Sequence, residues 1–253
     1  MNSMNIEFLG SNGGIGGTAE FNPGSTCIQV SEGILIDAGT GLAKLTVEQM
    51  SKIRHVFLTH AHLDHICCLP LFLANIIGKN NDGPVTIHAN SSTLDALQQH
   101  VFNQVLWPDF TRLPAHEPQL LQFNTLVSRQ VITVDGIELT AFATTHTVPT
   151  LGYAIKKAGV HTVFAADTTL TDALVAELQR FSAVDHLILE CSFASADEAL
   201  AIRTGHLTPA LIRQLLQRLE QPPQQVWLTH LKPTAVSAIV SELEPSWALV
   251  SSH

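Results

Sequence analysis

Basic residues are scarce in this sequence of 253 residues, which has only 13 Lys and Arg against 22 Asp and Glu. The formal net charge is −9 with neutral histidines, and the few basic residues form no cluster. Proteins that bind long nucleic acids depend on such clusters to neutralise phosphates. We therefore expect no long nucleic acid as a partner. A small anionic substrate is still compatible with this charge if metal ions supply the positive charge.

Long apolar runs and closely spaced cysteine pairs are also absent. No stretch of 18 apolar residues occurs, so the sequence predicts no membrane span. The first ten residues lack the basic start and apolar core of a signal peptide. The four cysteines form neither a CxxC metal motif nor the disulfide framework of a secreted protein. These absences predict a cytoplasmic protein with reduced thiols.

Hydrophobic residues, in contrast, make up 45% of the sequence, which indicates a large buried core. No Pro/Gly/Ser-rich linker interrupts the chain, so we expect a single domain over residues 1–253. Apolar patterns predict strands at residues 5–10, 26–30, 33–39, 55–60, 84–89, 137–146, 152–157, 161–168, 186–192 and 225–230. They predict helices at residues 42–50, 65–77, 93–105, 170–181, 208–219 and 234–243. This alternation predicts a layered α/β fold.

Side chains with acid–base or metal-binding chemistry stand where six of the predicted strands end. They are Asp37, His60, His146, Asp167, Glu190 and His230. In α/β sheets the loops at the carboxyl ends of the strands build binding sites. Six such residues in one chain therefore predict a single polar site at one edge of the fold.

The segment THAHLDH, residues 59–65, is the densest group of candidate metal ligands. Side chains alternate in an extended loop, so His60 and His62 point the same way and can share one metal ion. Asp64 and His65 follow as the chain turns into a helix, where they face a second position. Imidazole and carboxylate ligands without thiolate suit zinc, with manganese or iron as alternatives. The competing interpretation, a solvated turn with capping residues, does not need this density of ligands.

Three strand-end residues bring the set to seven ligands, enough for two divalent metal ions that share a bridging carboxylate. We predict Asp167 as the bridge, His146 as the histidine that completes the ligands of the first ion, and His230 as the histidine that joins Asp64 and His65 at the second. The alternatives are hydrogen-bonded core histidines for His146 and His230 and a helix N-cap for Asp167.

The order of these motifs resembles the metallo-β-lactamase superfamily. THAHLDH, His146 followed by GY at residues 152–153, AADT and LTH occur in the family's order between ILIDAGTG and LTHLKP. The resemblance implies an αββα sandwich with a dinuclear metal site at one edge. It also implies that Asp37 is a carboxylate that braces the ligand loop. The flavodi-iron branch has glutamate where His62 stands, so this chain does not resemble that branch.

Paired metal ions serve the hydrolysis of esters, thioesters and phosphodiesters alike, so residues outside the metal set must choose the substrate. We predict that Glu190 orients His206 as an imidazolium, which protonates a leaving sugar oxygen or braces a phosphoryl oxygen. The helix after His206 is expected to offer free N–H groups to a phosphate. Asp64 or Asp167 would orient the attacking hydroxide in addition to binding metal. The alternative is a capping histidine beside an ordinary strand-end carboxylate.

The segments HAHLDHICCLP, ECSF, GHLTP and THLKP together resemble class II 3′,5′-cyclic-nucleotide phosphodiesterases. This resemblance implies hydrolysis of a small cyclic nucleotide, cAMP or cGMP, to the nucleoside 5′-monophosphate. The tRNA 3′-processing endonucleases share a related glutamate–histidine pair, and glyoxalase II-type thioesterases share the HxHxDH loop. The acidic charge and the lack of basic clusters disfavour both. A metal-binding domain without activity is the non-enzymatic alternative.

Two further features have open interpretations. Phe102, Trp107 and Phe110 lie in the segment 101–114, where a ring could stack on a base or else cover the core or form a homodimer contact. Lys232 in THLKP either reaches the phosphate as a point charge or is a plain surface lysine.

Overall fold

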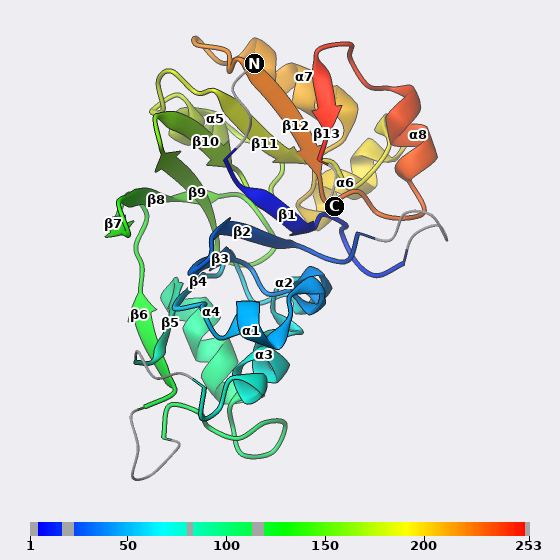
Figure 1. The fold of residues 1–253 in the computed structure, drawn as a ribbon. Helices are drawn as coiled ribbons and strands as arrows, with labels where there is room; N and C mark the ends of the chain where they lie inside the picture. The colour runs from blue at the N-terminus through cyan, green and yellow to red at the C-terminus, as the bar shows by residue number, and fades with distance from the viewer. Residues whose placement is uncertain (1–4, 17–22, 80–82, 113–118, 251–253) are drawn as a thin grey trace.

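Two β-sheets form the centre of the computed structural model, which describes residues 5–16, 23–79, 83–112 and 119–250 (Figure 1). Within these ranges the first sheet consists of β1 (Glu7–Gly10), β2 (Cys27–Ser31), β3 (Ile34–Ile36), β4 (His55–Phe57), β5 (Val85–Ala89) and β6 (Leu121–Thr125), in that spatial order. The second, in the order β13-β12-β11-β10-β9-β8-β7, consists of β7 (Val131–Val134), β8 (Ile137–Thr144), β9 (Thr150–Lys157), β10 (Val160–Phe164), β11 (His186–Glu190), β12 (Gln225–Thr229) and β13 (Trp247–Leu249).

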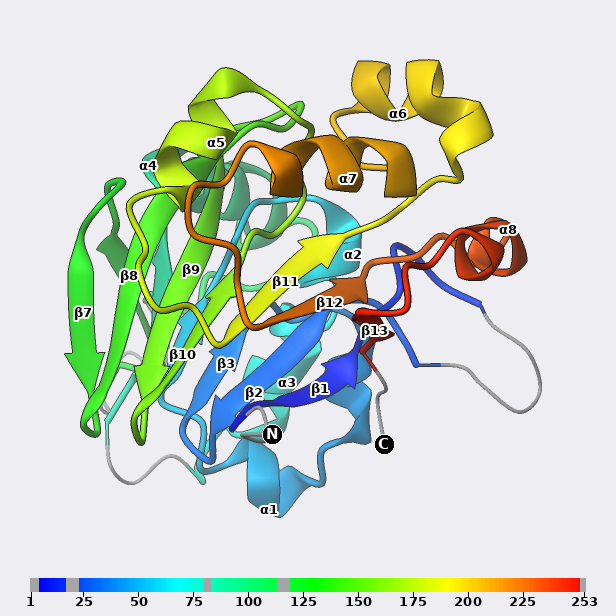
Figure 2. The same cartoon turned by 90° about the horizontal axis from the view of Figure 1, so that it is seen from above.

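Helices cover the outer side of each sheet (Figures 1 and 2). The first half of the chain contains η1 (Thr40–Lys44), α1 (Val47–Met50), α2 (Leu63–Ile66), α3 (Leu69–Asn75), α4 (Ser91–Ala96) and the π-helical turn η2 (Leu97–Val101). The second half contains α5 (Asp172–Leu178), η3 (Ser195–Asp197), α6 (Glu198–Thr204), α7 (Pro209–Gln217) and α8 (Val236–Ser241). The arrangement is the predicted αββα sandwich. Among the described residues, no helix is both long and apolar enough to cross a membrane.

Each sheet is buried on both faces, which explains the nearly continuous apolar runs of its central strands. In β3, Leu35 packs under the helices of the first half, while Ile34 and Ile36 point into the core between the sheets. In β11, Ile188 lies in the same central core, and its neighbours Leu187 and Leu189 pack under the helices of the second half. Successive side chains of a strand alternate between the faces, so apolar residues are needed at every position.

The strand directions bring the carboxyl ends of the important strands to one edge of each sheet. Strands β3 to β6 run parallel to one another, and so do β10 to β13. Strand β8 is antiparallel to β9, which is antiparallel to β10, so β8 and β10 run the same way. The segments that follow β8, β10 and β12, and the last residue of β11, therefore share an edge.

The helix predicted over residues 65–77 is interrupted at its start, and the structure shows two separate helices, α2 and α3. The backbone N–H of Cys68 donates to the carbonyl of Ala38 at 2.9 Å instead of continuing the helical ladder. Pro70, in the first turn of α3, has no N–H to donate. A bond to a distant part of the chain thus breaks the helix directly behind the THAHLDH loop.

The other long helices are also shorter than predicted. The pattern over residues 42–50 divides into η1 and α1 because Thr46 begins a new helix, in which its side chain and that of Gln49 form a reciprocal cap. The pattern over 93–105 ends after η2. There, the Asn103 side chain accepts hydrogen bonds from the N–H groups of Val105 and Leu106 at 3.0 and 2.8 Å. Such local bonds compete with the helical ladder.

The aromatic residues of the segment 101–114 pack against the core under the first sheet. Phe102 and Phe110 are each only 3% exposed, with ring centres 6.0 Å apart, and Trp107 is partly buried against the same cluster. Buried rings have no free face for a nucleobase, so Phe102 and Phe110 fit the interpretation that they cover the core. Leu113 and Pro114, at the end of this segment, lie outside the described residues.

A pair of histidines links β4 and β5 away from the THAHLDH loop. His88 stacks on Phe57 with a centroid distance of 4.2 Å, and its Nε2 lies 2.9 Å from Nδ1 of His55. The Asn124 amide donates to His88 Nδ1 at 2.8 Å, so this nitrogen is an acceptor and the ring proton is on Nε2. Burial, together with the nearby His55, lowers the pKa of His88 to about 4.

This low pKa predicts that His88 makes the protein less stable in mild acid. The unfolded chain binds the proton near pH 6.5, but the folded chain binds it only near pH 4. As the pH falls between these values, the free energy of unfolding should decrease by up to about 1.4 kcal/mol per pH unit for this one proton. Urea unfolding between pH 4 and 7 should show a shallower slope for His88→Gln than for the wild type. His100→Gln, which replaces an exposed histidine, should show the same slope as the wild type. Equal slopes for the wild type and both variants would contradict the prediction.

Candidate metal centre

Hydrogen bonds to a buried carboxylate at the end of β3 hold the THAHLDH loop in place. Asp37 directly follows β3, is fully buried, and accepts hydrogen bonds from the N–H of Thr59 at 2.8 Å and from its hydroxyl at 2.9 Å. The loop then continues in extended form to His62, which precedes the first turn of α2. Asp64 and His65 lie within α2. The predicted change from extended loop to helix therefore occurs inside the motif.

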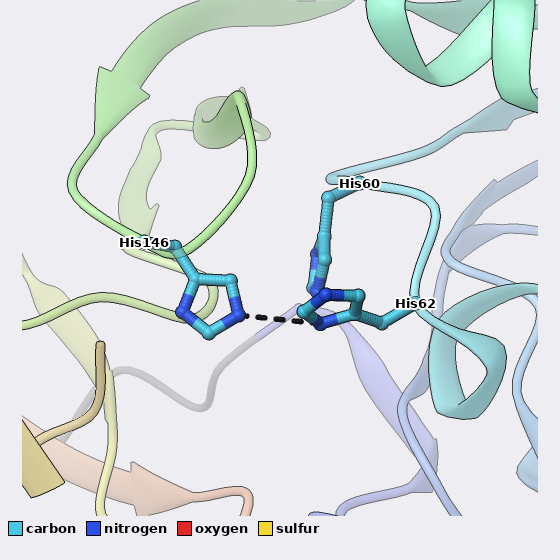
Figure 3. Close-up of side chains that lie close together, drawn as sticks. All are labelled: His60, His62 and His146. Carbon is cyan, nitrogen blue, oxygen red and sulfur yellow. Dashed lines mark hydrogen bonds between the residues drawn. The ribbon is translucent and has the colours of Figure 1, made fainter. Parts of the chain in front are cut away.

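Three histidines from the two sheets converge at this edge (Figure 3). His60 and His62 come from the loop after β4, and His146 comes from the segment after β8. The centres of the His60 and His146 rings are 5.1 Å apart, and His146 Nε2 lies 3.3 Å from His62 Nδ1. One nitrogen from each ring can be chosen so that all three lie within 4.8 Å of one another. This is the first predicted group of metal ligands.

Asp64, His65 and His230 form a second group of the same kind. His230 directly follows β12, and its Nε2 lies 3.3 Å from both His65 Nε2 and an oxygen of Asp64. His65 is fully buried, and only 2% of the surface of His230 is exposed. The structure thus brings together the residues predicted for a second ion.

Asp167 lies between the two groups and faces each with a different oxygen. Its Oδ2 is 3.9 Å from His60 Nε2 and 3.8 Å from His146 Nε2. Its Oδ1 is 3.5 Å from His65 Nε2 and 3.4 Å from His230 Nε2. This is the placement that a bridging carboxylate needs. The alternative role as a helix cap does not apply, because the Thr171 hydroxyl caps α5.

In the loop, two histidines use Nδ1 to contact the groups that hold them in place. His65 Nδ1 lies 2.7 Å from Oδ2 of Asp37, and His60 Nδ1 lies 3.0 Å from the hydroxyl of Thr59. These contacts leave Nε2 of each ring directed at Asp167. Metal-bound histidines commonly use one nitrogen for the ion and the other for such a partner.

The two histidines after β8 and β12 follow the same pattern. His146 Nδ1 donates to the carbonyl of Gly205 at 2.8 Å, and His230 Nδ1 lies 3.0 Å from the hydroxyl of Ser192. Nε2 of His60 is buried and has no hydrogen-bond partner among the described residues. A buried imidazole nitrogen without a partner is unfavourable, and a metal ion bound to its lone pair removes this cost. The donor set therefore fits divalent metal ions.

The electrostatics of the site also suit a cation. Burial lowers the pKa of His60 well below its usual value and lowers the pKa values of His62 and His146, which keeps these rings neutral with a lone pair free. Burial alone would also lower the pKa of His65, but Asp167 and Asp37 raise it well above its usual value. The surroundings of His65 thus favour positive charge, which is the condition for binding a metal ion.

The backbone is strained at the edge where the ligands gather. Ala166 and His230, which are not glycine, have φ angles of 52° and 59° in the left-handed region. Gly13 packs so closely on His230 that a Cβ atom there would lie 2.7 Å from its Nδ1. Such conformations cost free energy and persist where the surrounding structure holds them, commonly at functional sites. Here they turn the chain sharply after β10 and β12 so that Asp167 and His230 face inward.

The predicted Glu190–His206 pair forms next to these groups. Nδ1 of His206 lies 2.8 Å from Oε1 of Glu190, which is fully buried at the end of β11. The carboxylate also accepts hydrogen bonds from the N–H groups of Thr168, Ser192 and Leu207. Burial opposes the charged form of His206, but Glu190 overcomes this effect and raises the pKa of His206. The ring of His206 lies 5.0 Å from that of His146, between centroids.

The prediction that the next helix offers free N–H groups is wrong. In the first turn of α7, Pro209 has no N–H, and the Ala210 N–H donates to the hydroxyl of Ser195 at 3.0 Å. The N–H of Leu211 donates to the Thr208 hydroxyl, and the N–H of Ile212 to the Thr208 carbonyl. These N–H groups already donate hydrogen bonds to acceptors within the chain and cannot bind a phosphate.

Sequence reasoning missed two residues that support the site. Gly205 ends α6 with a φ of 73°, and its carbonyl holds His146. A Cβ atom at Gly205 would lie 2.8 Å from His146 Nδ1, so both the conformation and the space require glycine. A glycine is a common signal for the end of a helix, but the sequence pattern predicted no helix over residues 198–204. The buried Ser192 is the second residue, and no sequence pattern indicated its contacts.

A family model places the chain among known proteins. The model of the β-lactamase superfamily domain matches residues 33–231, from just before β3 to just after His230. The chain therefore belongs to the β-lactamase superfamily and has the metallo-β-lactamase fold. Membership in this family of metal-dependent hydrolases identifies it as a hydrolase, and the fold implies bound divalent metal ions.

The individual relatives include a cyclic-nucleotide phosphodiesterase and a ribonuclease Z. The chain is 41% identical over 88 residues to 3′,5′-cyclic-nucleotide phosphodiesterase 1 of Saccharomyces cerevisiae, covering 35% of this chain and 23% of the yeast protein. It is 30% identical over 158 residues to ribonuclease Z of Pyrococcus abyssi, covering 61% and 48% of the two chains. The chain thus spans less than half the length of these two curated relatives. The crystal structure of unliganded yeast PDE1 has the same fold, with a TM-score of 0.74 at 20% identity over 94% of this chain and 92% of that chain.

Proposed function

We propose that the protein is a dinuclear metal-dependent phosphodiesterase that hydrolyses 3′,5′-cyclic nucleotides, cAMP or cGMP, to nucleoside 5′-monophosphates. The observation that carries the proposal is the position of Asp167 between two ligand groups, with the Glu190–His206 pair beside them. The similarity to the yeast cyclic-nucleotide phosphodiesterase supports the choice of substrate.

Seven residues would hold the two ions, which we propose to be zinc, with manganese or iron as alternatives. His60, His62 and His146 belong to one ion, Asp64, His65 and His230 belong to the other, and Asp167 belongs to both. Nitrogen and carboxylate donors without thiolate suit these metals. When bound, paired divalent ions lower the pKa of water and neutralise charge on phosphoryl oxygens.

His206 would act as the general acid. Its Nδ1 is held by Glu190, so Nε2 is the nitrogen that remains to face a substrate. A raised pKa favours the protonated ring, and a proton from Nε2 neutralises the 3′ oxygen as that oxygen leaves phosphorus. Asp64 or Asp167 would orient the attacking hydroxide by accepting its proton in a hydrogen bond.

Lys232 would contribute charge on the same side of the site as His206. Its Nζ lies 5.4 Å from the centre of the Phe193 ring, and that ring lies 5.8 Å from the ring of His206. The favourable contact of an ammonium with an aromatic face restrains the lysine side chain. We propose that Lys232 approaches the phosphate of the substrate from this position.

A tRNA 3′-processing activity is the second candidate, because ribonuclease Z from Pyrococcus abyssi is also a relative. Precursor tRNA presents a long phosphate backbone, which proteins bind with clustered Lys and Arg. The net charge of −9 and the 13 Lys and Arg of this chain favour the small substrate.

The test is hydrolysis of cAMP and cGMP by protein loaded with zinc or manganese, with the 3′ and 5′ products separated by chromatography. We expect the 5′-monophosphate, loss of activity on chelation and its return when metal is added. A precursor tRNA is assayed in parallel. Cleavage of the tRNA alone would support the second candidate. No turnover of either nucleotide, in protein with about two metal ions per chain, would exclude the proposed substrates.

A further inference from the structure

The side chain of Ser192 lies between the Glu190–His206 pair and the candidate metal ligand His230. It is fully buried, and its hydroxyl oxygen lies 2.9 Å from Oε2 of Glu190 and 3.0 Å from Nδ1 of His230. The backbone N–H of Ser192 also donates to Oε2 of Glu190 at 2.9 Å, which fixes the position of the residue. Ser192 therefore contacts both the carboxylate of the Glu190–His206 pair and the candidate metal ligand His230.

The directions of these hydrogen bonds follow from the chemistry of imidazole. Nε2 of His230 faces Asp64 and Asp167, so as a ligand it needs a lone pair there, and the ring proton must be on Nδ1. That N–H donates to the Ser192 hydroxyl. The single hydroxyl proton of Ser192 then has two acceptors within reach, Oε2 of Glu190 at 2.9 Å and the His230 carbonyl at 3.1 Å. The shorter contact, with the charged carboxylate, is the stronger hydrogen bond.

A similar connection exists at the other carboxylate of the site. Asp37 contacts His65 directly at 2.7 Å, and it contacts His60 through the Thr59 hydroxyl, at 2.9 Å and 3.0 Å for the two steps. Glu190 likewise contacts one histidine directly and another through a hydroxyl. Two independent segments thus use the same arrangement, in which one carboxylate serves two rings.

We propose that Ser192 is a positioning residue that connects Glu190 to the metal ligand His230. The carboxylate, acting through the hydroxyl, orients the His230 ring, fixes its tautomer and makes it a stronger ligand, while the same carboxylate holds His206 directly. The inference rests on the proposed function only in taking His230 as a metal ligand. It predicts that metal affinity at one of the two positions depends on a residue that does not itself touch the ion.

The test measures zinc binding to metal-free protein in competition with a chromophoric chelator. The wild type is expected to bind two ions. Ser192→Ala should bind one of them about 10- to 100-fold more weakly, as is typical when a partner of a metal ligand is lost. Ser192→Thr, which keeps the hydroxyl, should stay within a few-fold of the wild type. Ser195→Ala is the matched control, because the Ser195 hydroxyl accepts a hydrogen bond from the Ala210 N–H and, within the described part of the chain, contacts no candidate ligand.

The outcomes separate this inference from the proposed function. Unchanged zinc affinity in folded Ser192→Ala would overturn the role of Ser192, and absence of metal binding by the wild type would overturn both proposals. Weakened binding at one position, in protein that hydrolyses no cyclic nucleotide, would support the role of Ser192 and reject only the substrate. If Ser192→Ala does not fold by circular dichroism, Ser192→Cys, which has a similar volume and a poor hydrogen-bonding group, is measured with the same expectations.

Discussion

Replacing Asp167 by alanine is expected to remove at least one of the two proposed metal ions and nearly all of the proposed phosphodiesterase activity. Among the described residues, this carboxylate is the one whose two oxygens face both ligand groups, at 3.4 to 3.9 Å from four imidazole nitrogens. Its loss leaves the first group with three histidines and no carboxylate, and the second group with Asp64 as its one carboxylate. We expect turnover to fall by at least about 100- to 1,000-fold, the scale seen when one preorganised electrostatic group is removed. Metal analysis and cAMP hydrolysis measure the two effects.

The control for this variant is Asp172→Ala, which removes an exposed carboxylate in the first turn of α5, five residues along the chain. Its ion pair with Arg218 is on the surface, where such pairs contribute at most about 1 kcal/mol. The control should retain two ions and wild-type turnover. If Asp167→Ala kept both ions and its activity, the assignment of Asp167 as the bridge would be wrong.

Replacing His206 by alanine is expected to reduce turnover of cAMP by about 100- to 10,000-fold, the usual contribution of a general acid, without changing metal content. In the wild type, activity should fall as the pH rises through the raised pKa of His206, because the imidazolium loses the proton that it donates. This alkaline decrease should be absent from the variant. His100→Ala, at an exposed histidine, should keep both the rate and the pH profile.

A substrate with a better leaving group separates acid catalysis from a structural effect. Bis(p-nitrophenyl) phosphate releases a phenolate that needs little protonation, so His206→Ala should hydrolyse it at close to the wild-type rate. An equal loss for cAMP and for the activated ester would show that His206 does not act as the acid. Loss of metal in the variant would place His206 among the ligands instead.

The sequence predicts most of the candidate site because many residues of this site lie at the ends of strands or directly after them. Glu190 is the last residue of β11, His230 directly follows β12, and Asp37 directly follows β3. A buried strand is recognisable from its continuous apolar run, and parallel strands bring their carboxyl ends to one edge. The convergence of these side chains therefore follows from local patterns and one topological rule.

Three of the four edge strands in the described sheets were not predictable in the same way. β6, β7 and β13 escaped detection, and each lies partly exposed at the border of its sheet. β6 and β7 have polar residues among the apolar ones, and β13 has only three residues. Their strand conformation depends on pairing with a neighbour rather than on their own pattern. The break between α2 and α3 also depends on a distant part of the chain. The N–H of Cys68 donates a hydrogen bond to the carbonyl of Ala38, 30 positions earlier in the sequence.

The partners of the ligand nitrogens also depend on contacts between distant segments. Gly205 holds His146 from 59 positions away, and Ser192 reaches His230 across 38 positions. Glycine and serine are common residues with many uses, so neither type identifies such a role in a single sequence. Thr59, in contrast, directly precedes His60, and its contact with that ring is local.

The seven candidate ligands are divided between the two sheets in an order that matters during synthesis of the chain. His60, His62, Asp64 and His65 follow β4 of the first sheet, whereas His146, Asp167 and His230 follow β8, β10 and β12 of the second. A nascent chain that has formed only the first sheet displays four donors without the shared carboxylate. Asp167 and His230 come later in the chain and follow strands of the second sheet. The seven candidate ligands therefore come together only when both sheets have docked. Metal ions held by all seven residues would therefore bind only after both sheets have docked, and they would link the first half of the molecule to the second.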